Sequence, residues 1–135
     1  MNIQQGLFWL ILTVFLEARD QPPVGQKNIV KIILNRAHKN QWPIETIVFA
    51  RKQFSCYNAG LLEALKKLVP EVKNMALVTD NVMRAIDEWE EGDNLKGATL
   101  YYNPKLVPGG FPASWDRKKT KVVIQEKDHI FLIEV

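Results

Sequence analysis

Cysteine and histidine are scarce in this sequence of 135 residues. It contains one cysteine, Cys56, and two histidines, His38 and His129. A lone cysteine cannot form a disulfide within the chain, and it cannot build a cysteine-based zinc site. We expect His38 on the exposed side of a helix, so it does not complete a zinc triad with His129. The sequence therefore implies no metal and no organic cofactor.

Long apolar runs and a strong excess of one charge are also missing. The most apolar stretch, residues 6–16, is shorter than the about 20 residues that a membrane-spanning helix needs. We therefore expect no stable membrane insertion, with reversible contact at a membrane surface as a lesser alternative. No Lys or Arg precedes this stretch and no small-residue cleavage site follows it, so we expect no signal peptide. The formal net charge of +3 is too small to indicate nucleic-acid binding, although it suits a polyanionic partner.

The composition that is present is typical of a folded domain. Hydrophobic residues make up 47% of the chain and charged residues 24%, and a chain of this length can bury a core of its own. We predict a single domain over residues 1–135, and a monomer. Apolar periodicity and proline positions predict helices at residues 3–19, 24–39, 44–50, 61–69 and 71–91, with a loop at residues 51–60.

Apolar residues also indicate which sides of these helices face the core. The first helix is apolar all round over residues 7–16, which predicts burial on all sides. In the second helix, Lys27, Lys31 and His38 lie outside the predicted core stripe. That stripe comprises Val30, Ile33, Leu34 and Ala37. The inner side of the last helix is predicted to comprise Val72, Met75, Ala76, Val82, Met83, Ile86 and Trp89.

The C-terminal part of the sequence changes to strand-like patterns. Residues 98–102, 121–125 and 129–135 favour strands, and the sequence Glu126-Lys127-Asp128 predicts a hairpin turn between the last two. Prolines and glycines mark residues 103–115 as a loop. Helices followed by a small antiparallel sheet define an α+β domain.

Glu17 is a candidate for chemistry because it continues the first helix beyond the apolar run. We expect it at the edge of the core, where burial and the negative end of the helix dipole both favour the neutral carboxyl. A carboxyl that is protonated near neutral pH can act as a general acid. The alternative, a helix-end glutamate that faces water, fits the local pattern equally well.

Several short motifs occur in a recognisable order along almost the whole chain. They are Glu17-Ala18-Arg19, Gly25-Gln26, Ile33-Leu34-Asn35-Arg36, Gln53-Phe54-Ser55, Gly97-Ala98-Thr99-Leu100-Tyr101-Tyr102-Asn103-Pro104, Trp115 and His129-Ile130-Phe131. Each is weak, but together they resemble the signature of SleB-type cell-wall hydrolases, which begins E-A-R-G-E…G-Q…V-L-N-R. These are the catalytic domains of spore-cortex-lytic enzymes and related phage lysins.

The resemblance implies a fold similar to lytic transglycosylases and goose-type lysozymes, with a helical lobe, a small antiparallel sheet and a substrate groove between them. It implies cleavage of the β-1,4 bond between N-acetylmuramic acid and N-acetylglucosamine, with Glu17 in the place of the catalytic glutamate. Asp20 replaces the glycine of the signature and Gln21 its second glutamate, so a mechanism with two carboxylates would need Asp20. Residues 124–129 are a longer version of the family's Ile-Gly-x-His segment, in a predicted turn.

The remaining site candidates are residues that could bind a sugar. Tyr101, Tyr102 and Asn103 lie where a strand ends, and alternation lets only one tyrosine face the groove. Tyrosine and Trp115 offer flat apolar surfaces to a sugar, with a place in the core as the alternative. The other candidates are Gln53, Phe54, Ser55 and His129. Local hydrogen bonds are the alternative role for the loop residues and for the histidine.

Two basic features have simpler expected roles. Arg36 is expected to be structural and to tie down the break after the first helix. The dense positive charge of residues 117–121 would hold an anionic glycan loosely, although such charges are usually solvated.

These features predict a peptidoglycan lytic transglycosylase whose partner is the glycan strand and whose products are 1,6-anhydro-muropeptides. A muramidase that uses water, an N-acetylmuramoyl-L-alanine amidase or a Cys56–His129 peptidase, and a non-catalytic glycan-binding module remain alternatives. We expect the protein in the host cytoplasm of a phage-infected bacterium, or associated with a virion.

Overall fold

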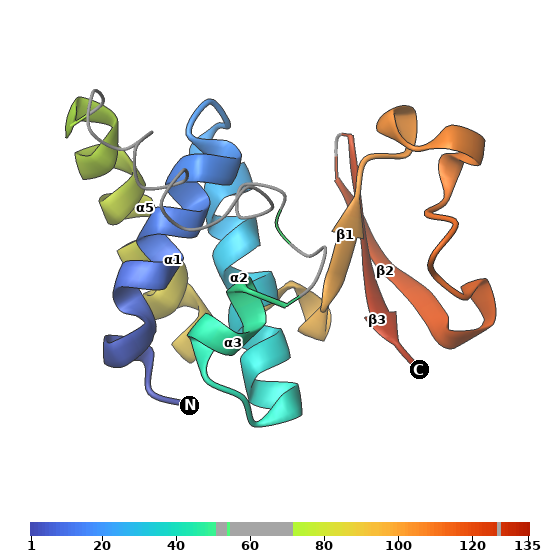
Figure 1. Ribbon diagram of the computed structural model, residues 1–135, viewed down its shortest axis with the longest axis horizontal. Coiled ribbons are helices and arrows are strands. Elements are labelled where there is room, and N and C mark those ends of the chain that lie inside the picture. Colours follow the sequence, from blue (N-terminus) through green and yellow to red (C-terminus); the bar gives the residue numbers. More distant parts are fainter. Residues whose placement is uncertain (51–53, 55–71, 127) are drawn as a thin grey trace.

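The computed structural model describes residues 1–50, 54, 72–126 and 128–135. Helices are followed by a three-stranded sheet, so the predicted α+β class is confirmed (Figure 1). Figure 1 shows the sheet on one side of α2 (Pro23–Asn40), with α1 (Ile3–Ala18) and α5 (Val72–Glu90) on the other. The predicted loop at residues 51–60, apart from Phe54, and the predicted helix at residues 61–69 lie outside the described residues.

Prolines set the boundary between the first two helices. The helix α1 ends at Ala18, and Pro22 and Pro23 begin α2, because proline fits the first turn of a helix but not its interior. The short helix α3 (Ile44–Val48) follows Pro43 in the same way. The sharp turn leaves the last residues of α1 beside the first turn of α2.

The helices pack around one apolar cluster. The predicted stripe of α2 is confirmed, because all four of its residues are fully buried. The other helices contribute Leu10, Val14, Phe15, Ile44, Ile47, Val78, Val82 and Ile86. The helices α1 and α3 approach so closely that a Cβ atom at Gly6 would clash with the side chain of Ile44. This contact explains a glycine inside an otherwise apolar helix.

The expected faces of α1 and α5 were wrong in part. The helix α1 is not buried on all sides, because the side chain of Phe8 is 54% exposed. In α5, Ala76 and Met83 are exposed, while Val78 and Ala85 lie in the core. Successive residues are about 100° apart around a helix, so positions 76 and 83 lie well away from the face that carries 78 and 85. In the described part of the chain, no helix is long and apolar enough to cross a membrane.

The sheet is antiparallel, with the strand order β1-β3-β2. Its strands are β1 (Leu100–Tyr102), β2 (Thr120–Glu126) and β3 (His129–Glu134), each within two residues of the predicted bounds. Tyr101 pairs with Phe131 in β3, and β1 is an edge strand. Between β1 and β2 the chain forms three short 3₁₀ turns, the last of them at Arg117–Lys119.

The sheet is attached to α2 by an apolar cluster and by one buried amide. The cluster comprises Ile32, Leu95, Ala98 and Phe131. The side-chain nitrogen of Asn35 donates hydrogen bonds to the backbone carbonyls of Asn94 at 2.7 Å and Ala98 at 2.8 Å. Its side-chain oxygen accepts a hydrogen bond from the indole nitrogen of Trp89 at 2.8 Å. Asn35 therefore joins α2, α5 and the segment that leads into β1.

Candidate active site

A hollow of about 260 Å³ lies between the helices and the sheet. Its walls come from the end of α1, the first turns of α2, the strands β1 and β3, and the turn after β1. They comprise Glu17, Ala18, Gln21, Gly25, Asn28, Ile29, Tyr101, Leu106, His129 and Phe131. Three of the predicted site residues, Glu17, Tyr101 and His129, therefore meet in one place although they are far apart in the sequence.

The two sides of this hollow differ in chemistry. The helices and the break between α1 and α2 contribute the polar groups of Glu17, Gln21 and Asn28, and Glu17 is the one carboxylate among the described residues that line the hollow. The sheet contributes aromatic rings: the centroid of Tyr101 lies 5.8 Å from that of His129 and 6.2 Å from that of Phe131. A half-buried carboxyl opposite flat rings suits a ligand with both polar groups and apolar faces, as a sugar has.

Gln26 holds the end of α1 in place, a role that the sequence analysis missed. It is almost completely buried. Its side-chain nitrogen donates to the backbone carbonyls of Ala18 at 3.1 Å, Arg19 at 3.4 Å and Gln21 at 3.4 Å, all just after Glu17. Its side-chain oxygen accepts a hydrogen bond from Asn81 of α5 at 2.7 Å. Gln26 thus satisfies helix-end carbonyls that have no partner within α1.

A second hollow, of about 240 Å³, lies beside the first and shares Tyr101 with it. It is lined by Ile32, Arg36, Phe54, Thr99, Leu100, Tyr101 and Trp115. The structure therefore places Phe54 and Trp115 in the neighbouring hollow and not beside Glu17. Arg36 does not tie down the break after α1, because it lies about three and a half turns further along α2 than Pro23. Burial lowers the pKa of the Arg36 guanidinium, and the carboxylate of Glu134 opposes this change.

The other predicted site residues have different surroundings. The ring of Tyr102 packs edge-on against Phe111 at 5.7 Å and Trp115 at 5.6 Å, between ring centroids, so the two tyrosines of β1 point in different directions. The side-chain oxygen of Asn103 accepts a hydrogen bond from the backbone nitrogen of Lys105 at 2.9 Å and caps the turn Pro104–Leu106. Gln53, Ser55 and Cys56 lie outside the described residues.

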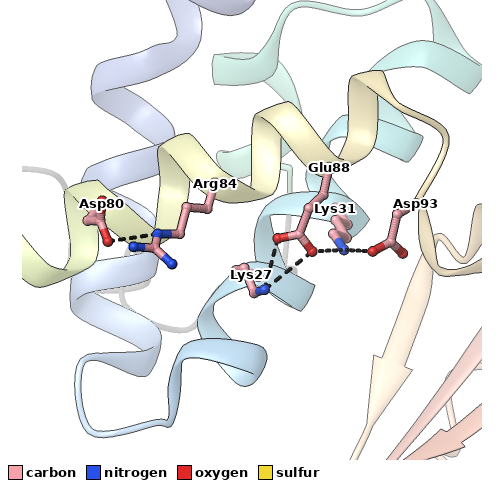
Figure 2. Close-up of polar contacts among 6 residues, drawn as sticks. All are labelled: Lys27, Lys31, Asp80, Arg84, Glu88 and Asp93. Carbon is pink, nitrogen blue, oxygen red and sulfur yellow. Dashed lines mark hydrogen bonds and ion pairs between the residues drawn. The ribbon is translucent and has the colours of Figure 1, made fainter.

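An ion-pair network joins α2 to α5 on another side of the first turns of α2 (Figure 2). Glu88 accepts hydrogen bonds from Lys27 at 2.8 Å and from Lys31 at 3.1 Å, and Lys31 also pairs with Asp93 at 3.0 Å. The expectation that Lys31 lies outside the buried side of α2 was wrong, because Lys31 is only 3% exposed and the more exposed carboxylates of Glu88 and Asp93 pair with its ammonium group. The hydrogen bond from Lys27, and the charge and hydrogen bond of Lys31, lower the pKa of Glu88 although its partial burial opposes this.

Comparison with known proteins assigns the class of this chain. Residues 20–132 match the cell wall hydrolase family, so the chain belongs to that family. It is similar to the spore cortex-lytic enzyme of Oceanobacillus iheyensis, with 28% identity over 138 residues that cover 97% of this chain and 44% of that protein. The family predicted from the sequence motifs, the SleB-type cell wall hydrolases, is thereby confirmed.

Two features of these matches bear on the site. The chain spans less than half the length of the spore cortex-lytic enzyme. The family match begins at residue 20, so the assignment of Glu17 rests on its motif and on its position in the hollow. No solved structure matches the chain.

Proposed function

We propose that this chain cleaves the glycan strand of bacterial peptidoglycan at the β-1,4 bond between N-acetylmuramic acid and N-acetylglucosamine. The observation that carries the proposal is the position of Glu17, half-buried at a helix end in a hollow that also contains Tyr101 and His129. Membership of the cell wall hydrolase family supports the substrate class. A helical layer, a small sheet and a hollow between them agree with a lysozyme-like fold, which stays a prediction.

The first chemical step needs one acid. Glu17 donates its proton to the glycosidic oxygen, the bond from this oxygen to C1 of N-acetylmuramic acid breaks, and the sugar develops oxocarbenium character. Fixed dipoles at the wall, such as the side-chain amides of Gln21 and Asn28, or the acetamido group of the substrate itself, stabilise that positive charge. Glu17 is left as a carboxylate next to the reacting carbon.

The second step distinguishes a lytic transglycosylase from a hydrolase. Glu17 takes a proton either from the 6-hydroxyl of the same sugar, whose oxygen then bonds to C1, or from a water molecule. Gln21 lies in the hollow where the family signature has a second glutamate, and an amide cannot act as a base for water. We therefore favour the internal reaction, which gives a 1,6-anhydro end.

Digestion of purified peptidoglycan, with the fragments identified by mass spectrometry, tests the proposal. The expected products are muropeptides with 1,6-anhydro ends and no new reducing ends. Reducing-end muropeptides alone would replace the transglycosylase with a muramidase. Release of stem peptides from intact glycan would indicate an amidase, and binding without any product would indicate a glycan-binding module.

A further inference from the structure

The second hollow has the character of a binding site for an anion attached to an apolar ring system. Arg36 brings a half-buried positive charge to a wall that also carries the aromatic rings of Phe54, Tyr101 and Trp115. Because Tyr101 lines both hollows, a chain of sugars that passes over this ring would extend from Glu17 to Arg36. Thr99, on the same wall, adds a hydroxyl group.

We propose that this second hollow is a carboxylate-binding subsite, in which the guanidinium of Arg36 binds an acidic group of the peptidoglycan strand whose glycosidic bond lies at Glu17. The inference rests on the proposed function and deepens it. Two groups of the strand carry the required chemistry: the lactyl carboxyl of a muramic acid without its peptide, and the carboxylates of the stem peptide. A planar guanidinium matches a carboxylate with two parallel hydrogen bonds, which a lysine cannot reproduce.

Among the described residues, Glu134 is one carboxylate that would compete with the substrate for Arg36. Its negative charge acts on Arg36, and one of its oxygens lies 3.5 Å from the hydroxyl of Thr99. Glu134 is exposed near the end of β3, so it can stay in water when a substrate carboxylate takes its place. The same arrangement makes a separate variant informative, because neutralising Glu134 removes one negative charge that competes with a substrate carboxylate for Arg36.

Binding of soluble glycan strands in the Glu17→Gln background tests the subsite without turnover. The strands are used with their stem peptides, after removal of the peptides, and after conversion of all carboxylates to amides. Arg36→Met should weaken binding of carboxylate-bearing strands about 10-fold, since hydrogen bonds between charged groups are the strong ones. Arg36→Lys should recover part of the loss, and amidated strands should bind all variants alike. The form of strand that shows the effect identifies the lactyl or the peptide carboxylate.

Two further variants keep the test decisive. Arg84→Met removes an exposed arginine of α5 that pairs with Asp80 and lies outside both hollows, and it should bind like the parent (Figure 2). Glu134→Gln alters an exposed side chain and should tighten binding of carboxylate-bearing strands. An equal loss with native and amidated strands in Arg36→Met, or no tightening in Glu134→Gln, would overturn the subsite. Failure of the proposed function would instead show as absent cleavage by the parent protein with Glu17 intact.

Discussion

Glu17 is a single residue on which the proposed chemistry depends. Replacement by glutamine keeps the size of the side chain and removes the acidic proton. We expect Glu17→Gln to lower turnover on peptidoglycan by at least about 10²–10⁴-fold, the usual contribution of general acid–base catalysis. The melting temperature should change little, because the amide fits the same half-buried position.

The neighbouring carboxylate provides a matched control for this variant. Asp20 is exposed in the break after α1, and it is the one residue there that could replace the family's second glutamate. Asp20→Asn should keep turnover close to that of the unmodified chain. Retained turnover in Glu17→Gln would exclude Glu17 as the general acid. A large loss of turnover in Asp20→Asn would restore a mechanism with two carboxylates.

At the scale of elements, Gln26 fixes the end of α1 relative to α2 and α5. Gln26→Met removes three donor contacts to backbone carbonyls and leaves the amide of Asn81 without its acceptor. Buried polar groups that lose their partner cost about 1–3 kcal/mol each, so the free energy of unfolding should fall by roughly that amount or more. Turnover per folded molecule should also fall, because Glu17 directly precedes the turn that these bonds hold.

A double-mutant cycle checks that the effect runs through Asn81. Asn81→Ala should cost less than Gln26→Met, and the two changes together should cost clearly less than their sum. Thr79→Ala in the same helix is the control, because its hydroxyl bonds only to Met75 within α5 among the contacts of the described residues. Additive losses for Gln26 and Asn81 would show that the two amides act independently.

The attachment of α2 to α5 through Glu88 should make stability depend on pH. Lys27 and Lys31 lower the folded-state pKa of Glu88 below its ordinary value of 4.5. A carboxyl with a lowered folded pKa stabilises the fold above its unfolded pKa, and this stabilisation is lost as the pH falls through the folded pKa. We expect Glu88→Gln to cost roughly 1–3 kcal/mol near neutral pH, because it leaves Lys31 buried with Asp93 alone.

Thermal or urea unfolding across pH measures this contribution. The difference between Glu88→Gln and the unmodified chain should shrink as the solution becomes more acidic than the folded pKa. Asp80→Asn, which breaks the exposed pair with Arg84 at 3.0 Å, should cost at most about 1 kcal/mol at any pH. A constant difference for Glu88→Gln from neutral to acidic pH would show that its charge does not stabilise the fold.

Local patterns predicted the elements well and their partners poorly. Prolines at 22, 23 and 43 marked helix starts, and alternating apolar residues marked the strands, because both signals act within a few residues. The burial of Lys31 could not be predicted from α2, since the carboxylates that neutralise it come from α5 and the turn beyond it. For the same reason, the contact expected of Arg36 was wrong, because α2 places it in the second hollow and away from the break after α1.

At the scale of the molecule, the site depends on how two layers meet. Glu17 was predicted as a site residue from its motif and its place at the end of an apolar run, but nothing in its own segment predicts that Tyr101 and His129 line the same hollow. They face it because Asn35 and the cluster around Ile32 attach the sheet to α2. The two amides Gln26 and Asn35 come from the motifs of the family signature, and here they position the helix end and the sheet that form the hollow.

The charge of the whole chain predicts a dependence of substrate binding on salt. The net charge is +3, and Lys118 and Lys119 are exposed in the basic turn before β2. Exposed charges are screened beyond about 8 Å at physiological ionic strength, so affinity for anionic glycan should fall as salt rises. The double variant Lys118→Gln/Lys119→Gln should bind more weakly at low salt and lose much of the salt dependence.

The double variant Lys39→Gln/Lys96→Gln lowers the net charge by the same two units, and it changes exposed lysines outside this turn. Equal effects of the two double variants would assign the attraction to the overall charge and not to the basic turn, and binding that is independent of salt would exclude an electrostatic contribution from either.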